Sequence, residues 1–459
     1  MNTEHIWDPA VETLPRSELE ALQLQRLQAQ VARVAERSPL YRRKFAEAGV
    51  TPDQVRTLDD VRRLPFTTKA ELRESQEHAP PYGEQLAVAP EEIAWTYTTS
   101  GSTGTPLLVP RNRADVERIG ELCARLFHGV GMRGGDVVQM AYQYHFIMGG
   151  IGGTLGTLRT GAQLINSGPG QTERQLWSLE RLGTTMLLAT ASYAEYLARV
   201  GAERGVDLDK LRLRTVLGGG EAGFALPSVK ARLKAAFPTL ERALDMWGFT
   251  DMWSPLAGEY EEGAGLTLFE DVALFEVVDP DTDEPVAPGE DGELIVTDLV
   301  GETTPLLRFR TGDRVRLSDE PGTDGRTARR LPGGILGRTD DMITVRSRNL
   351  WPSAVAGVIN EITELNGQFL CVVDRPAEHD VLTVRAELRP GAVPGPELEE
   401  RVRDLVRRVG SVRADHVELV EAGTLPHFPY KAIRKLDLRR GETLEQLMAI
   451  AERQASAAR

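Results

Sequence analysis

Residues 96–112 read TYTTSGSTGTPLLVPRN, and this stretch bears most directly on the fold. Every residue from Thr98 to Thr105 is Thr, Ser or Gly, so the segment offers hydroxyl donors and closely approachable backbone N–H groups, as a phosphate-binding loop does. It is not a Walker A loop, because no Gly-Lys-Ser/Thr follows. The apolar run after it predicts a strand rather than a helix. By itself, such a loop is more often only the tip of a hairpin.

The composition is that of a globular protein with more than one domain. The chain has 459 residues, of which 41% are hydrophobic and 27% charged, and one core rarely serves so long a chain. The net charge is −14 and we find no basic patch, which argues against nucleic acid as a bulk partner. Two distant cysteines and seven scattered histidines suggest neither a disulfide framework nor a zinc site.

The N-terminal stretch and the hydropathy bear on location. The first 14 residues have neither the basic nor the apolar segment of a signal peptide, and no apolar run approaches the length of a membrane span. We therefore expect a cytoplasmic protein with no membrane partner. The oligomeric state is not readable from the sequence, and a homodimer is one of the states left open.

Periodicity divides the chain into two parts. From about residue 93 to residue 299, strand-like runs such as TVLGGG (215–220) alternate with helical runs, which predicts an α/β domain. Residues 273–299 are typical of two antiparallel strands around a turn-rich loop. We predict a large multi-sheet α/β domain with an antiparallel β region over residues 1–340. A small α+β domain is predicted over residues 341–459.

Two helices are predicted in detail. The first, SELEALQLQRLQAQVARVAERSP, begins at a capping box of Ser17 and Glu20 and is stopped before Pro39. The second lies in the small domain and reads PELEERVRDLVRRVG. Its apolar face is predicted to consist of Leu398, Val402, Leu405 and Val409. Both helices are expected to pack on a core.

Five further motifs lie far from the opening loop. They are LGGGEAG (217–223), DMWGFTD (245–251), RFRTGDRVRL (308–317), GRTDDMITVRSRNLWPS (337–353) and LPHFPYKAIRK (425–435). Each alone is typical of turns, packing or a solvated face. In this order they supply what ATP-dependent acyl activation requires: an aromatic wall for adenine, one carboxylate for Mg²⁺, another for the ribose, and a mobile cation for the developing charge.

With these motifs the chain resembles the acyl-adenylate-forming superfamily, and within it the phenylacetate–CoA ligase-like branch. The likeness covers nearly the whole chain, from IWDPAVETLPRSELEALQLQRL and LPFTTKAELRE to GRTDDMITVRSRNLWPS. The resemblance implies a small C-terminal domain that rotates between two half-reactions. In the first, ATP, Mg²⁺ and a carboxylic acid give an acyl-adenylate and pyrophosphate. In the second, CoA takes the acyl group and AMP leaves.

The resemblance also implies roles for residues of this sequence. It makes Lys431 the lysine of adenylation, Thr250 a contact of the α-phosphate, and Asp251 the Mg²⁺ ligand. The other implied residues hold the phosphates (Ser100, Gly101, Ser102, Thr103, Gly104, Thr105), flank adenine (Gly219, Gly220, Glu221, Trp247, Gly248), bind ribose or phosphate (Asp313, Arg338) and form the hinge (Asp340).

The segment AYQYHFIMGGIGG (141–153) follows a predicted strand and is expected to line the acid pocket, although core packing is equally typical of its aromatic residues. The expected pocket residues are Tyr142, His145, Phe146, Gly149, Gly150 and Gly218. His145 is the side chain we most readily expect to hydrogen-bond a polar group on the acid. The pocket favours a small acid, aryl or compact hydroxylated, over a long fatty acid.

Three positions depart from the family pattern. Thr105 stands where a lysine is usual, which removes one cation from the phosphate loop. Asp251 stands where Glu is usual, and it is one methylene shorter. Ser347 stands where a glycine lets pantetheine pass, so an adenylating enzyme that uses an amine or another non-CoA acceptor stays an alternative. A non-catalytic nucleotide-binding relative is the third possibility.

Overall fold

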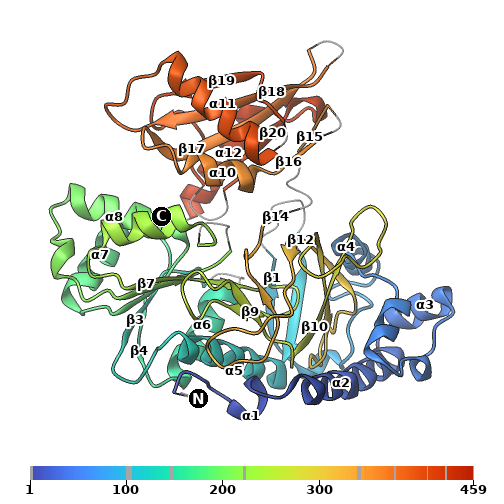
Figure 1. The fold of residues 1–459 in the computed structure, drawn as a ribbon. Helices are drawn as coiled ribbons and strands as arrows, with labels where there is room; N and C mark the ends of the chain where they lie inside the picture. The colour runs from blue at the N-terminus through green and yellow to red at the C-terminus, as the bar shows by residue number, and fades with distance from the viewer. Residues whose placement is uncertain are drawn as a thin grey trace.

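The structure is a computed structural model. It describes residues 4–99, 106–144, 148–220, 224–338, 343–346, 348–376, 379–410, 412–428 and 432–457. Figure 1 shows a larger body formed by the elements from α1 to β14, and above it a smaller body formed by those from β15 to α12. Within the described residues, no helix is both long and apolar enough to cross a membrane.

The larger body is built around an eight-stranded sheet with the order β13-β9-β8-β7-β6-β5-β3-β4. Its strands are β3 (Val137–Met140), β4 (Gln163–Asn166), β5 (Met186–Leu188), β6 (Thr215–Gly218), β7 (Arg242–Trp247), β8 (Ala257–Gly258), β9 (Leu266–Leu268) and β13 (Arg330–Leu331). The five strands from β4 to β7 in this order are parallel. Ligand sites of open parallel sheets lie at the carboxyl ends of such strands.

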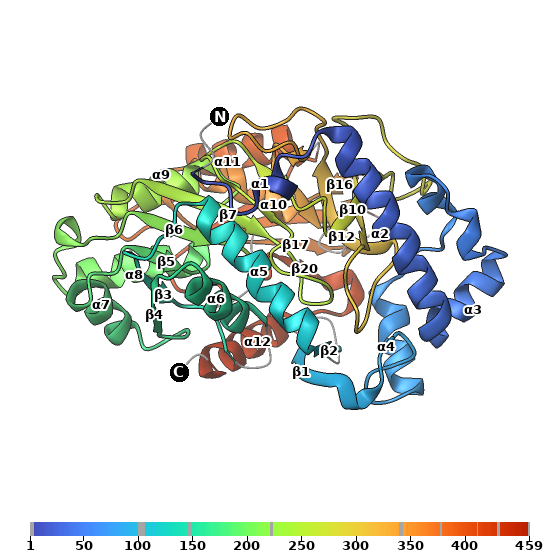
Figure 2. The same cartoon turned by 90° about the horizontal axis from the view of Figure 1, so that it is seen from below.

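Helices connect the parallel strands, which confirms the predicted alternation. They are α6 (Met148–Arg159), α7 (Thr172–Arg181), α8 (Ala191–Glu203) and α9 (Pro227–Ala236). In Figure 2, seen from below, α7 and α8 lie at one end of the larger body and α3 (Pro39–Ala48) lies at the other. The remaining helices of this body are α1 (Pro9–Glu12), α2 (Arg16–Arg37), α4 (Lys69–His78) and α5 (Arg113–Gly129).

The predicted antiparallel region is confirmed as a second sheet, with the order β10-β11-β12-β14. Its strands are β10 (Ala273–Val278), β11 (Asp291–Asp298), β12 (Phe309–Arg316) and β14 (Gly337–Arg338). Both sheets and α5 share one core, which includes Leu126 and Phe127 of α5, Leu268 of β9 and Phe275 of β10. Apolar burial between the layers is the main stabilising term for such a core.

The strands on either side of the Thr/Ser/Gly-rich segment form a hairpin. Its strands are β1 (Ile93–Thr98) and β2 (Leu108–Asn112), which pair antiparallel, so the strand predicted after the loop is confirmed. The base of the loop is closed by Thr99 N, which donates to Leu107 O at 3.0 Å, and by Leu107 N, which donates to Thr99 Oγ1 at 3.1 Å. Residues 100–105 themselves lie outside the described residues.

The smaller body is an α+β unit, as predicted. Its elements are β15 (Ile343–Val345), β16 (Arg348–Leu350), α10 (Pro352–Ile359), β17 (Leu365–Asp374), β18 (Val381–Leu388), α11 (Pro396–Gly410), β19 (His416–Val420), β20 (Lys435–Asp437) and α12 (Leu444–Ala457). Four strands form a mixed sheet with the order β19-β18-β17-β20. The domain boundary predicted between residues 340 and 341 falls in a segment outside the described residues and stays a prediction.

The two bodies meet beside β14. Ser353 Oγ, in α10, donates a hydrogen bond of 2.8 Å to Leu336 O, directly before β14. The Arg314 guanidinium of β12 lies 4.0 Å from the ring centre of Trp351, the residue before α10. An arginine over an indole gains about 1 kcal/mol or more where it is partly desolvated. The domain contact therefore involves the same strands that carry Asp313 and Arg338.

Two sequence predictions about the helices were wrong in detail. Helix α2 begins at Arg16 with Pro15 at its N-cap and no side-chain cap, because Pro15 is extended and Ser17 already lies in the first turn. The predicted capping box therefore does not form. In α11, Val409 is 40% exposed while Val406 is fully buried, so the buried face follows the spacing of four residues from Leu398 through Val402 to Val406.

The buried carboxylate of Glu12 ties the N-terminal segment to the larger body. It lies 2.7 Å from Arg326 Nε and 3.6 Å from Arg125 Nε, and it accepts backbone hydrogen bonds from Trp7 and Asp8. We expect Glu12→Gln to lower the free energy of unfolding by about 3 kcal/mol, because two buried guanidinium groups each lose one of their two carboxylate partners and keep only Asp271 or Asp324. Urea denaturation followed by tryptophan fluorescence measures the change.

The matched control for this prediction is Glu20→Gln. Glu20 pairs with Arg16 on the surface at 2.8 Å, and its side chain is 48% exposed. The control should change the free energy of unfolding by less than about 0.5 kcal/mol. Equal losses in the two variants would contradict a special role for Glu12.

Candidate functional site

A buried carboxylate joins three of the predicted site residues. Asp313, on β12, accepts a hydrogen bond of 2.9 Å from Trp247 Nε1 at one oxygen and one of 2.9 Å from Arg338 at the other. Asp313 is 6% exposed and Trp247 is 8% exposed. The cluster links the end of β7 in the large sheet to β12 and β14 in the second sheet. Charge-assisted bonds of this kind orient a carboxylate strongly.

The predicted metal ligand, Asp251, is buried a few residues after the end of β7. Its backbone is held by Arg111 of β2, which donates to the carbonyls of Asp251 and Met252 and stacks over Trp253 at 4.9 Å. Its Oδ1 accepts no hydrogen bond, although Lys69 Nζ lies 3.2 Å away. A buried carboxylate oxygen with spare lone pairs suits a hard cation, so Asp251 fits Mg²⁺.

A single carboxylate at this position agrees with how Mg²⁺ binds at nucleotide sites. The part of the chain that the structure describes holds no cluster of three or more His, Cys, Asp or Glu side chains that could form a metal cage. Mg²⁺ usually uses one or two protein carboxylates, with substrate phosphates and water completing its octahedron. Asp251 would therefore hold the ion together with the phosphates of a nucleotide.

Gly218, predicted for the acid pocket, and the predicted adenine-flanking Gly219 and Gly248 lie where backbones come very close. A methyl group at Gly218 would collide with Ala189 O, and one at Gly219 would collide with Met246 O. At Gly248 it would lie 2.7 Å from Ser254 Cα. Strand packing alone therefore requires glycine at these positions. Gly220 differs, because its φ of +87° and the open space beside it suit a turn at the surface of a site.

Tyr142 connects the predicted acid pocket to these glycines. Its hydroxyl accepts a hydrogen bond of 2.8 Å from Gly219 N and donates to Ala189 O at 3.1 Å. The side chain therefore fixes the end of β6 against the end of β5. Its hydroxyl serves the backbone, so the aromatic ring rather than the polar tip is available to a ligand.

The predicted pocket glycines lie at the start of α6. Gly149 lies close to the Tyr142 side chain, where an added methyl group would meet Cβ at 3.8 Å. Gly150 N donates to Gln143 O at 3.0 Å, and an added methyl group would collide with that carbonyl. The neighbouring Tyr144 hydroxyl donates to Asn166 Oδ1 at 2.5 Å, and burial raises its pKa. The segment thus forms a tightly folded wall.

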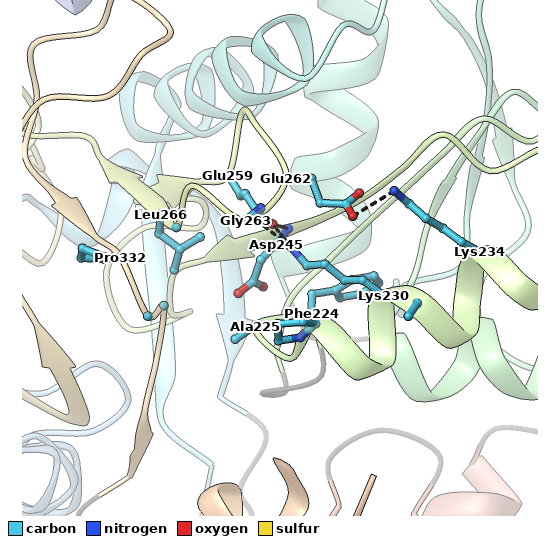
Figure 3. A pocket seen from close by; sticks show the side chains of 15 residues that line it. Phe224, Ala225, Lys230, Lys234, Asp245, Glu259, Glu262, Gly263, Leu266 and Pro332 are labelled. Carbon is cyan, nitrogen blue, oxygen red and sulfur yellow. Dashed lines mark hydrogen bonds and ion pairs between the residues drawn. The ribbon is translucent and has the colours of Figure 1, made fainter. Parts of the chain in front are cut away.

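A cavity of about 360 Å³ lies next to the predicted adenine segment (Figure 3). Its lining includes Phe224 and Ala225, which directly follow that segment, the side chain of Asp245 on β7, and residues 332–334. The volume is at the lower end of the range typical of small-molecule sites. The cavity could therefore admit the base of a nucleotide whose ribose lies at Asp313.

The wall of this cavity is held by a buried ion pair. Lys230 Nζ lies 2.5 Å from Glu259 Oε2, and Glu259 also accepts hydrogen bonds from Asp245 N at 2.8 Å and Gly263 N at 2.6 Å. Figure 3 shows the pair beside Asp245. With so many donors the Glu259 carboxylate is satisfied, so we assign this pair to the structure of the site and not to its chemistry.

Several predicted residues lie outside the described residues. They are Ser100 to Thr105, His145, Phe146, Glu221, Asp340, Ser347 and Lys431. Their roles stay predictions. The structure does bring Trp247, Asp313 and Arg338 together, and it places Asp251 and Thr250 in the turn that follows β7.

Sequence reasoning missed three residues of the site. Arg111 holds the backbone at Asp251, Asp245 lines the cavity, and Lys69 pairs with Asp251. Asp245 lies inside a motif singled out from the sequence, so its position next to Trp247 was a usable signal. Arg111 and Lys69 lie 140 and 182 residues from Asp251, and no local feature of the sequence predicts either contact.

Family models match most of the chain. Residues 13–298 match the AMP-binding enzyme family, and residues 347–439 match the AMP-binding enzyme C-terminal domain. The chain is also similar to two phenylacetate-coenzyme A ligases. That of Thermus thermophilus is 38% identical over 386 residues, covering 83% of this chain and 84% of the relative. That of Escherichia coli is 34% identical over 441 residues, covering 94% and 97%.

Among solved structures the chain is similar to 2-hydroxyisobutyryl-CoA ligase. With 2-HIB-AMP in the postadenylation state, that enzyme is 30% identical and gives a TM-score of 0.89 over 99% of this chain and 96% of its own. With 2-HIB-AMP and CoA in the thioesterification state it is 31% identical and gives 0.72 over 98% and 96%. Because the same enzyme gives both scores, this chain is structurally more similar to the first of these two structures than to the second.

The hydrogen bond from Trp247 to Asp313 can be tested directly. We expect Trp247→Phe to lower the free energy of unfolding by about 2 kcal/mol, because a buried carboxylate oxygen loses its donor. The affinity for ATP should fall about fivefold, since Asp313 is then less well oriented. Chemical denaturation and isothermal titration calorimetry measure the two effects.

A matched control for Trp247→Phe is Trp177→Phe. Trp177 is 55% exposed on α7, so its loss should alter neither stability nor ATP affinity. If Trp247→Phe left the affinity for ATP unchanged, the assignment of Asp313 and Trp247 to the nucleotide site would be wrong.

Proposed function

Since the chain belongs to the AMP-binding enzyme family, in the branch of the phenylacetate–CoA ligases, and is an AMP-forming acid–CoA ligase, we propose that its acid is small, either aryl or compact and hydroxylated. The observation that carries this proposal is the wall at Tyr142 and Gly150, where the Tyr142 hydroxyl is bound by the backbone and Gln143 O closes the space beside Gly150. A pocket with so little free space beside its wall suits a compact acyl group.

The names of the relatives include acids of both proposed kinds. Phenylacetate is named in the curated ligases and 2-hydroxyisobutyrate in the solved structures, and both are short acids. An aryl acid would pack against the ring of Tyr142, whose hydroxyl is already engaged by the backbone. A hydroxylated acid would need a polar partner, and His145 is the side chain we propose for it.

The described residues suggest how the first half-reaction is organised. We assign the ribose hydroxyls to Asp313, whose two oxygens are already oriented by Trp247 and Arg338. Asp251 would hold Mg²⁺, which when bound neutralises phosphate charge and thereby assists departure of pyrophosphate. Thr250 would contact the α-phosphate, where the acid's carboxylate oxygen forms its bond to phosphorus. Lys431 would balance the charge that develops there.

The second half-reaction replaces the acyl–phosphate anhydride bond of the acyl-adenylate by a thioester. The sulfur of CoA attacks the acyl carbonyl, the bond to the AMP phosphate breaks, and AMP leaves. Ser347 is the residue that we expect to border the passage of pantetheine, and the domain contact at Ser353 and Trp351 must change if the smaller body rotates. A homodimer and a cytoplasmic location stay predictions, the first testable by sedimentation velocity.

A panel of acids tests the proposed substrate class. Pyrophosphate release is measured with ATP, Mg²⁺, CoA and phenylacetate, benzoate, 2-hydroxyisobutyrate or palmitate. We expect kcat/KM for the best small acid to exceed that for palmitate at least about 100-fold, because a closed wall rejects a long chain. Palmitate as the fastest acid would overturn the pocket assignment.

The acceptor is tested separately. AMP release in the presence of CoA should exceed AMP release with hydroxylamine, and Ser347→Gly should speed the thioester step while leaving acid-dependent pyrophosphate exchange unchanged. Lys431→Ala should slow that exchange at least about 100-fold. If Ser347→Gly alone created CoA activity, an amine or another acceptor would be the natural one. If Lys431→Ala had no effect, the catalytic assignment of Lys431 would be wrong.

A further inference from the structure

We propose that Lys69 supplies the cation that binds the β- and γ-phosphates of ATP and the leaving pyrophosphate. It would stand in for the lysine that the family pattern places at Thr105 in the phosphate loop. The inference rests on the proposed function, since it concerns the ATP that this function consumes. It assigns a nucleotide-binding role to the N-terminal helical region, from which no site residue was predicted.

The position of Lys69 next to the metal ligand is the first observation. Its Nζ lies 3.2 Å from Asp251 Oδ1 and 3.3 Å from Oδ2, although 182 residues separate the two in sequence. The Lys69 side chain is 37% exposed, whereas the Asp251 side chain is 7% exposed. The ammonium group is thus accessible from solvent beside a buried carboxylate, as expected for a cation that meets an incoming anion.

The anchoring of α4 is the second observation. Before its first residue, Thr67 N donates to Arg308 O at 3.0 Å, and Arg310 N donates to Thr67 O at 2.9 Å, so the chain is tied to β12. In its last turns, Gln76 exchanges two hydrogen bonds of 2.7 and 3.0 Å with the backbone of Leu108, at the start of β2. Helix α4 therefore spans from the strand of Asp313 to the strand that follows the phosphate loop.

Glu71, the acidic residue two positions after Lys69, already has partners of its own. Glu71 caps α4, accepting from Thr68 N at 2.7 Å, and its second oxygen pairs with Lys44. Lys44 in turn donates to Phe66 O at 2.6 Å. Lys69 is consequently balanced by Asp251, the same carboxylate that fits Mg²⁺. When Asp251 binds the metal ion, the charge of Lys69 becomes available to the phosphates on that ion.

The number of positive charges expected around the phosphates supports a transfer of Lys69 from Asp251 to the nucleotide. A polyphosphate needs several cations around it, and each close ammonium–phosphate contact is a strong charge-assisted interaction. The loop of this chain has Thr105 where a lysine is usual, so one positive charge is missing there. A lysine suits the replacement, because its long flexible stem carries a point charge that can move from carboxylate to phosphate.

The test is the nucleotide selectivity of Lys69→Gln, measured by calorimetry with Mg²⁺ and either α,β-methylene-ATP or AMP. We expect affinity for the ATP analogue and for pyrophosphate to fall at least about tenfold, with AMP affinity unchanged, since AMP lacks the β- and γ-phosphates. Equal loss for AMP, or no loss for the analogue, would overturn the proposal. Tighter binding of Mg²⁺ in the variant, without weaker analogue binding, would show that Lys69 only occupies the metal position.

Three variants complete the design. Lys210→Gln removes an exposed lysine that pairs with Asp207, and it should leave all affinities unchanged. Lys69→Arg keeps the charge and should retain most of the analogue affinity even if Lys69→Gln folds poorly. Adding Thr105→Lys to Lys69→Gln should restore analogue affinity to within about threefold of the parent. Failure of that rescue would contradict the replacement of one lysine by the other.

The proposed function can fail independently of this inference. If the unaltered enzyme showed no acid-dependent pyrophosphate exchange, the function would be wrong. The binding measurements with the ATP analogue would still report whether Lys69 contacts the outer phosphates.

Discussion

The carboxylate of Asp313 is the constraint on which the arrangement of this molecule depends. It is buried, and it accepts hydrogen bonds from Trp247 and Arg338 at 2.9 Å each. Those partners come from the large sheet and from the last strand before the small domain. One side chain thus orients an aromatic ring and a guanidinium group at the place where the two sheets meet. Leaving such a carboxylate unpaired would cost several kcal/mol, which explains why both donors are so closely placed.

Backbone crowding is the second constraint, and it connects the fold to the choice of substrate. The ends of β5, β6 and β7 approach so closely that only glycine fits at Gly218 and Gly219. Tyr142 adds a hydrogen-bonded bridge between these ends. A wall made of backbone cannot relax by changing a rotamer, so it discriminates by size more sharply than a wall of flexible side chains. With the acid placed there as we propose, the parallel sheet itself would limit the volume that the acyl group can occupy.

The sequence predicted those features that depend on local pattern or on motif chemistry. Alternating strands and helices and the antiparallel region follow from short segments. The structure brings Trp247, Asp313 and Arg338 together, and their roles in a site stay predictions. The contact between Lys69 and Asp251 does not, because it spans 182 residues and depends on how α4 is tied to two strands. The failed cap at Ser17 has a local cause, since the extended Pro15 starts α2 earlier. Exposure of Val409 depends on whether the core covers Val406 or Val409, and helical spacing allows either one.

The residues that we propose for the nucleotide site lie on the same two strands as the domain contact, and this has a mechanical consequence. Asp313 of β12 pairs with Arg338 of β14, while Arg314, the next residue, stacks on Trp351 of the small domain at 4.0 Å. Leu336, directly before β14, accepts the hydrogen bond from Ser353. A nucleotide that changes the bonds of Asp313 must therefore act on strands that also hold the small domain. The rotation of the small domain that we propose is an equilibrium between orientations, and these strands lie at the contact that it must change. Since a ligand shifts such an equilibrium only through differential contacts, the Asp313–Arg338 pair is where those contacts can arise.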